Sequence, residues 1–77
     1  HNFDYKTALQ ELVQRKKDQL LHYELTGESG PDHDKHFDVE VLLNGKPVGK
    51  GTGSSKKRAE QSAAENAIER LFPGELD

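Results

Sequence analysis

The first periodic segment of the chain predicts an amphipathic helix from Asp4 to about Lys17. Apolar residues recur there at spacings of three and four, which is the period of one helix face; they are Tyr5, Ala8, Leu9, Leu12 and Val13. Asp4 is a suitable N-cap, and the bases at 15–17 would interact favourably with the negative end of the helix dipole. The opposite face is polar, carries few full charges and consists of Thr7, Gln10, Glu11 and Gln14.

Two alternating segments further along the chain predict strands over residues 20–26 and 36–43. Successive side chains of a strand point to opposite faces, so alternation of apolar and polar residues indicates a half-buried strand. The apolar positions are Leu21, Tyr23 and Leu25 in the first segment and Phe37, Val39, Val41 and Leu43 in the second. The polar positions between them predict a solvated sheet face with His22, Glu24, Asp38 and Glu40.

Asn44-Gly45 predicts a two-residue turn that joins the second strand to a third strand over residues 46–52. Both residues tolerate the positive φ angles that a type I′ turn requires. This pairing would place Val41 opposite Val48 and would put Lys50 on the apolar side of the sheet. We therefore expect a bulge, or a strand that extends past the core, near the glycines on either side of Lys50.

The last periodic segment predicts a helix from Lys56 to about Leu71, with Ser55 as its N-cap. Its apolar stripe is mostly alanine, which lets a helix lie close to a sheet, and comprises Ala59, Ala63, Ala64, Ala67, Ile68 and Leu71. Pro73-Gly74 marks the end of the helix.

The predicted element order is α-β-β-β-α, an α+β fold in which two helices cover one face of a three-stranded antiparallel sheet. The chain has room for a single small domain over residues 1–77, with an ordered core at about 4–72. It has no Cys, which excludes a disulfide framework and Cys-ligated zinc modules. No apolar run approaches the roughly 18 residues that span a bilayer, and no signal peptide is visible. The chain begins without Met, and we expect it to be a piece of a longer protein.

Charge is unevenly distributed along the chain. The net charge is −3, but residues 41–59 contain five bases and no acid. The remaining residues hold six bases and 14 acids, a net charge of −8. A basic stripe on an acidic body can attract a polyanion, although such a run is equally compatible with a solvated face.

Three segments are not explained by folding alone. Residues 27–35 form a nine-residue connection without an apolar residue, longer than the roughly two to five residues usual in hairpins; this indicates a functional loop or a plain surface excursion. Residues 49–57 combine glycines, which let backbone approach a ligand closely, with a helix start. The bases at 56–58 lie at the positive end of the helix dipole, where they destabilise the helix. This placement favours binding of an external anion. The alternative is a solvated helix terminus in which the negative charge of Glu60 offsets the bases. The polar face of the first helix suits a hydroxyl-rich partner, but an ordinary exposed face has the same composition.

Motifs for catalysis and cofactor binding are weak. The glycine run lacks the Gly-Lys-Ser/Thr spacing of a phosphate-binding P-loop, and no βαβ unit surrounds it as in dinucleotide-binding domains. Gly27-Glu28-Ser29-Gly30 formally matches the loop of KH domains, but it lies between strands, and its acid would repel a nucleic-acid backbone. His33 and His36 could bind a metal ion, although further ligands have no clear source. We therefore expect no catalytic residue, metal or cofactor in this domain.

Four motifs are distributed along the chain, and the similarity that they carry extends from Asp4 to about Leu71. They are Tyr5-Lys6-Thr7-x-Leu9-Gln10-Glu11, Gly30-Pro31-x-His33, Phe37-x-Val39-x-Val41 and Gly51-x-Gly53-x-Ser55-Lys56-Lys57-x-Ala59-Glu60-x-x-Ala63-Ala64. This combination resembles the double-stranded-RNA-binding domain family, and within it the C-terminal domain of bacterial ribonuclease III.

The resemblance implies three contact regions for duplex RNA. The site residues that it implies are Thr7, Gln10, Glu11, Gln14, Pro31, His33, Ser54, Lys56 and Lys57. The four residues of the first helix would meet 2′-hydroxyls and base edges in one minor groove, and the two loop residues would enter the next. The last three would meet phosphates across the intervening major groove. Many members carry Lys or Arg where Ser54 stands here, and Asp32 and Asp34 add negative charge to the loop.

The implied function is binding of double-stranded RNA by shape, which would present the duplex to the endonuclease domain of a ribonuclease III-type parent. That N-terminal domain, absent here, would be Mg²⁺-dependent and would make the parent a homodimer in the cytoplasm. No membrane partner is expected. Three other functions remain open: a protein–protein or dimerisation module of the same fold, the RNA-binding domain of a different parent, and a metal-dependent hydrolase site around His33 and His36.

Overall fold

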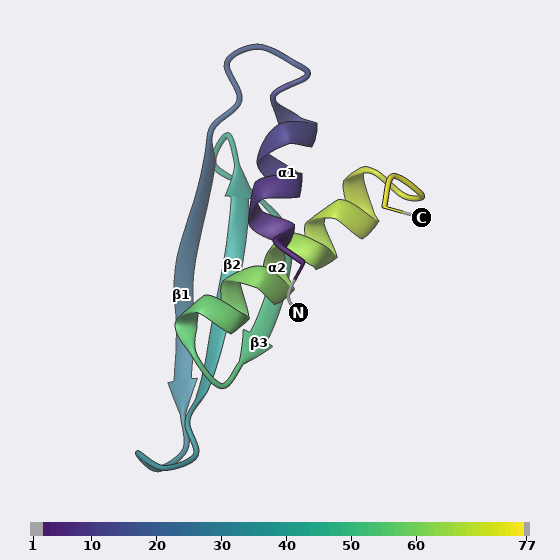
Figure 1. Cartoon of the computed structure of the whole chain (residues 1–77). Coiled ribbons are helices and arrows are strands. Elements are labelled where there is room, and N and C mark those ends of the chain that lie inside the picture. The colour runs from purple at the N-terminus through teal and green to yellow at the C-terminus, as the bar shows by residue number, and fades with distance from the viewer. Residues whose placement is uncertain (1–2, 77) are drawn as a thin grey trace.

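The elements follow one another in the predicted order along the chain. The computed structural model describes residues 3–76 and contains a short helix, three strands and a longer helix (Figure 1). These are α1 (Tyr5–Val13), β1 (Leu21–Ser29), β2 (His36–Leu43), β3 (Lys46–Gly53) and α2 (Lys56–Leu71). The prediction of an α-β-β-β-α fold is confirmed.

The strands form one antiparallel sheet in the order β1-β2-β3, and both helices lie on the same face of it (Figure 1). The turn between β2 and β3 has the predicted geometry, since Asn44 and Gly45 adopt φ angles of 53° and 84°. On the uncovered face, the four polar residues predicted there are exposed or half-buried. Neither helix in the described part of the chain has the length and apolar character of a membrane span.

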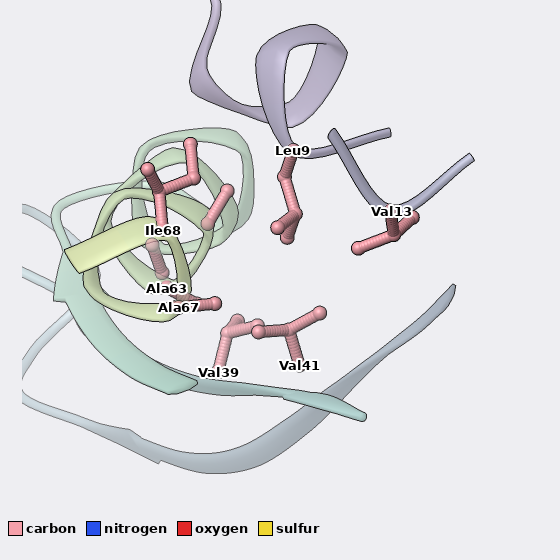
Figure 2. Close-up of a cluster of buried hydrophobic side chains, with 9 residues drawn as sticks. Leu9, Val13, Val39, Val41, Ala63, Ala67 and Ile68 are labelled. Carbon is pink, nitrogen blue, oxygen red and sulfur yellow. The ribbon is translucent and has the colours of Figure 1, made fainter. Parts of the chain in front are cut away.

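The core lies between the middle strand and the two helices. Leu9 and Val13 from α1, Val39 and Val41 from β2, and Ile68 from α2 gather in one cluster (Figure 2). Four alanines of α2 complete the buried set, namely Ala59, Ala63, Ala64 and Ala67. The burial of this apolar surface is the main source of stability for so small a domain.

Small residues let α2 lie directly on β3. A Cβ atom on Gly51 would be 2.3 Å from the backbone nitrogen of Ala63, and one on Gly49 would be 2.7 Å from the Ala63 carbonyl oxygen. Neither position accepts a side chain, because helix backbone cannot yield as a flexible side chain does. The prediction that Leu71 belongs to the buried apolar stripe of α2 is wrong. Leu71 is 39% exposed, because the last turn of α2 extends past the sheet (Figure 1).

The expected bulge in β3 is present and corrects the predicted strand register. Val41 lies opposite Gly49 rather than Val48, which is the extra residue of the bulge. One inserted residue reverses the side-chain alternation beyond it. Lys50 consequently lies opposite Glu40 and is exposed, while the glycines on either side of Lys50 face α2.

The first helix is shorter than predicted and ends at Val13 rather than at Lys17. The next backbone hydrogen bonds span three residues instead of four, which tightens the chain into a turn, and Asp18 then adopts a positive φ of 61°. The predicted interaction of three bases with the helix dipole is therefore wrong, because these bases lie beyond the last turn. Arg15 instead pairs with Glu75, with 2.6 Å between their nearest side-chain atoms.

The first strand is longer than predicted, so the loop after it is shorter. β1 continues to Ser29, and its last three residues pair with residues 36–38 of β2. These pairs join backbone groups, which leave no apolar signature in the sequence. The connection between β1 and β2 therefore comprises residues 30–35 rather than 27–35.

Candidate nucleic-acid interface

The polar face of α1 points away from the core. Thr7, Glu11 and Gln14 are exposed and Gln10 is half-buried, whereas Leu9 on the opposite side is completely buried. Spacings of three, four and seven residues align the four polar side chains along one side of the helix. The structure thus brings together all four residues predicted for the first contact region.

Asp4 caps α1 and holds Thr7. Its Oδ1 accepts a hydrogen bond from the Thr7 amide at 3.1 Å, and its Oδ2 accepts one from the Thr7 hydroxyl at 2.7 Å. The side-chain amide of Gln61, from α2, donates to the same Oδ1 at 2.9 Å. These hydrogen bonds, with that from Gln61 first, lower the pKa of Asp4 from 3.8 to about 2, so Asp4 is ionised at neutral pH.

The start of α2 presents exposed bases in its first turn, namely Lys56, Lys57 and Arg58. Ser55 is the N-cap, as predicted, and its hydroxyl accepts a hydrogen bond from the Arg58 amide at 3.1 Å. The first turn of a helix carries a positive partial charge, so the bases and the dipole attract an anion together. Ser54 is exposed directly before the cap.

The loop between β1 and β2 holds Pro31 and His33 in its exposed part. A turn closes the loop, in which the Asp34 amide donates to the Pro31 carbonyl oxygen at 2.9 Å. Gly30 enters this turn with a φ of 88°, and a Cβ atom there would lie 2.3 Å from the Asp34 carbonyl oxygen. The loop conformation therefore requires glycine at this position.

Lys35 offsets the acidic character of the loop. Its ammonium nitrogen lies 2.5 Å from Glu28 Oε2 and 3.9 Å from Asp32 Oδ1. The hydrogen bond from Lys35 is the main cause of a lowered pKa of Glu28, and the charge of Lys56 lowers it further. The base of the loop and the start of α2 are thus electrostatic neighbours. The Lys35–Glu28 pair was not predicted, because residue 28 was expected in a loop rather than on a strand.

Two surface hollows connect these regions. A hollow of about 860 Å³ lies between the start of α1 and the first half of α2, and its lining includes Asp4, Tyr5, Lys57, Arg58 and Gln61. A second hollow, of about 460 Å³, is lined by Asp32, His33, Asp34, Lys35, Phe37 and Ser54. His33 of the loop and Ser54 before α2 therefore flank one hollow. Along the length of the molecule the loop comes first, then the start of α2, then α1 (Figure 1).

Gln61 is the residue that sequence reasoning missed most clearly. Its spacing of four from Lys57 places both on the same side of α2. Its contact with Asp4 joins residues that are 57 positions apart, and no local pattern reports such a contact. Arg58, known from the sequence only as part of the basic stripe, lines the same hollow as Gln61.

Among the described residues, the alternative metal site at His33 and His36 has no group of three potential ligands. His33 lies in the loop, and His36 is the first residue of β2. Within residues 3–76, no three His, Cys, Asp or Glu side chains are grouped so that they could hold a metal ion.

Comparison with known proteins agrees with the fold. The family profile described as "Double-stranded RNA binding motif" matches residues 5–71. The chain is 57% identical over 69 residues to "Ribonuclease 3" of Listeria monocytogenes serovar 1/2a, 57% over 68 residues to that of Listeria welshimeri, and 58% over 67 residues to that of Streptococcus pneumoniae. These matches cover 90%, 88% and 87% of this chain, but only 30%, 30% and 29% of the relatives. The resemblance found in the motifs is thus confirmed, and the chain belongs to the double-stranded RNA binding motif family, in the form found in bacterial ribonuclease III.

Proposed function

We propose that this domain binds double-stranded RNA by its shape. The observation that carries the proposal is the placement of two polar surfaces, on α1 and on the loop, at either side of the basic start of α2 (Figure 1). A-form RNA offers 2′-hydroxyls and base edges in a wide, shallow minor groove, and phosphates line its deep major groove. A sheet that holds the three surfaces at a fixed spacing fits two successive minor grooves and the major groove between them.

Each residue of the proposed interface has a role that suits its chemistry. The side chains of Thr7, Gln10, Glu11 and Gln14 would bond to 2′-hydroxyls and base edges, Pro31 and His33 would enter the second minor groove, and Ser54, Lys56 and Lys57 would contact phosphates. Phosphate contacts fix the position of a protein without reading sequence, so we expect little sequence preference. DNA lacks the 2′-hydroxyl and should bind more weakly.

We further propose that the domain belongs to a ribonuclease III-type parent and presents duplex RNA to its N-terminal endonuclease domain. The support is the similarity to proteins named "Ribonuclease 3", of which this chain spans 30% of the length. In the parent, the catalytic residues, the Mg²⁺ and the homodimer contacts would belong to the nuclease domain, and the present domain would contribute RNA binding alone. The proposed location is the cytoplasm, where bacterial RNA duplexes form.

Gel-shift titrations test the proposal with one sequence in three forms: an RNA duplex, an RNA–DNA hybrid and a DNA duplex, each of about 20 base pairs so that the roughly 16 that such a domain spans are available. We expect the affinity to fall in that order. Equal affinity for the RNA and DNA duplexes would contradict recognition by shape. A domain that ignores all three forms but self-associates in sedimentation experiments would instead be a protein–protein module.

A further inference from the structure

The start of α1 is fastened to α2 by directional contacts. The Tyr5 amide donates a hydrogen bond to Gln61 Oε1 at 2.7 Å, and Gln61 Nε2 donates to Asp4 Oδ1 at 2.9 Å. One residue away, the ammonium of Lys6 lies 2.5 Å from Glu60 Oε1. The single side chain of Gln61 therefore holds both the cap and the first residue of α1.

These contacts matter because the rest of α1 is held without directional bonds. The helix has nine residues, fewer than the roughly 12–15 that an isolated helix needs for marginal stability. Its buried residues, Leu9 and Val13, contribute hydrophobic contacts, which are not directional. The hydrogen bonds at its start therefore add a directional constraint to the packing of α1 against α2.

The chemistry of the four groups fixes which atom donates in each bond. A backbone N–H can only donate, so the oxygen of the Gln61 amide faces Tyr5 and its nitrogen faces Asp4. An ionised carboxylate can only accept hydrogen bonds, so the Thr7 hydroxyl must donate its single proton to Asp4 Oδ2. The exposed Thr7 oxygen is then left with lone pairs alone.

We propose that Gln61 is a positioning residue that acts through Asp4 to hold the Thr7 hydroxyl as a hydrogen-bond acceptor, selective for the 2′-hydroxyl of ribose. The inference rests on the proposed binding of duplex RNA. A phosphate oxygen has no proton to donate, so it is a poor partner for this Thr7 oxygen. Deoxyribose offers no donor at the 2′ position. Among the groups of the nucleic-acid backbone, Thr7 would thus favour a ribose 2′-hydroxyl over phosphate and deoxyribose, because the contact from α2 fixes the direction of its hydroxyl proton.

A double-mutant cycle on duplex RNA tests this coupling, with Gln61→Leu to remove both bonds and Thr7→Val to remove the hydroxyl. We expect Gln61→Leu to weaken RNA binding about tenfold, the equivalent of one net hydrogen bond. In the Thr7→Val background, Gln61→Leu should lower the RNA affinity about threefold or less, because the Thr7 hydroxyl that Gln61 positions is already absent. The salt dependence should stay that of the wild type, since no phosphate contact is lost.

Asn66→Ala is the matched control for the loss of a side-chain bond from α2. Asn66 Oδ1 accepts a hydrogen bond from the Lys50 amide at 3.0 Å, a contact between α2 and the sheet. This variant should bind RNA within about twofold of the wild type once the folded fraction is taken into account. If Asn66→Ala weakened binding as much as Gln61→Leu, general loosening of α2 would explain both, and the proposal would be wrong.

A measurement without RNA separates the inference from the proposed function. In the free protein, the carboxyl resonance of Asp4 should titrate near pH 2, and Gln61→Leu should move this midpoint upward toward 3.8. Gln61→Met, whose unbranched side chain is close in length to that of glutamine, supplies the same test if the leucine variant does not fold, because it also removes both hydrogen bonds without adding a charge. A wild type that fails to bind duplex RNA would refute the proposed function. The role of Gln61 would be refuted, without affecting the proposed function, by either of two results in a domain that binds RNA. One is an Asp4 titration midpoint that Gln61→Leu does not move. The other is a double variant whose loss of affinity equals the product of the two single-variant losses.

Discussion

The two helices present different chemical groups to the proposed RNA partner. The exposed side of α1 carries hydroxyl, amide and carboxylate groups, and directional hydrogen bonds from α2 orient its first turn. The first turn of α2 carries three exposed bases and a helix dipole of the same sign. Long-range attraction to phosphates decays with salt, whereas hydrogen bonds in a groove depend on geometry. In the proposed binding mode, a domain with a net charge of −3 would approach a polyanion because the start of α2 would supply the attraction and α1 would read the groove.

The largest effect is expected from a change that disables both surfaces together. Val39 lies in the core beneath both helices and is 3% exposed, so Val39→Ala should lower the free energy of unfolding by roughly 1–3 kcal/mol. Binding should fall only in proportion to the unfolded fraction, as measured by thermal circular dichroism and gel shifts on the same sample. Leu71→Ala, on the exposed end of α2, is the control and should cost less. A fully folded Val39→Ala variant that cannot bind RNA would place this residue in the interface instead.

The basic surface can be removed without touching α1. The double variant Lys56→Ala/Lys57→Ala should weaken binding about tenfold or more at low salt, to a similar extent for every duplex sequence. The slope of log affinity against log salt should shrink by roughly two units, one for each lost phosphate contact. Lys46→Ala removes a base at the start of β3, outside the proposed interface, and should leave the slope unchanged. An unaltered slope in the double variant would exclude both lysines from phosphate binding.

Glu11 separates groove reading from general electrostatics most sharply. Removing a carboxylate near RNA should strengthen binding if charge alone matters. If Glu11 accepts hydrogen bonds from sugar hydroxyls or base amino groups, Glu11→Ala should weaken binding about fivefold with unchanged thermal stability. The penalty should shrink when 2′-deoxy residues replace the contacted riboses. Glu24→Ala, on the uncovered sheet face, makes the same charge change and should not weaken binding; tighter binding by Glu11→Ala would refute the role of α1.

The smallest expected effect is on acid stability. The pKa of Asp4 is about 2 in the folded chain and has an ordinary value of 3.8, so its cap stabilises the fold fully above pH 3.8. That contribution should disappear as the pH falls from about 4 through about 2, because protonation then removes an acceptor that only the folded state uses. Thermal denaturation at a series of pH values should show a shallower acid dependence in Asp4→Asn than in the wild type. Identical curves would mean that Asp4 does not cap α1 in solution.

The two helices also differ in how well the sequence foretold them. The alanine stripe, the Ser55 cap and the turn at Asn44-Gly45 are local patterns, and each was predicted at the right residues. The hydrogen bonds that hold the start of α1 to α2 were not predicted, because Gln61 meets Asp4 across 57 residues and a polar residue on a helix gives no sequence signal of its distant partner. The extension of β1 to Ser29 was missed for a related reason: it depends on backbone pairing rather than on apolar side chains.

The bulge at Val48 was predicted only in part. Lys50 on the apolar side was a visible conflict, so a bulge could be expected near it. Its position could not be derived from the strand pattern, because it depends on the close approach of α2 to Gly49 and Gly51. Local periodicity therefore predicted the elements, whereas the contacts between elements had to come from the structure.

Binding of duplex RNA by the two helix starts and the loop can be tested by mapping the backbone amide signals of the domain by NMR during titration with a duplex RNA. We expect the shifts to gather in three places: the first turns of α1 around Thr7, the loop around His33 and the start of α2 around Lys56. We also expect the uncovered sheet face, around His22 and Glu24, to stay unchanged. Shifts centred on that sheet face, with the helix starts unaffected, would contradict the proposed mode of RNA binding.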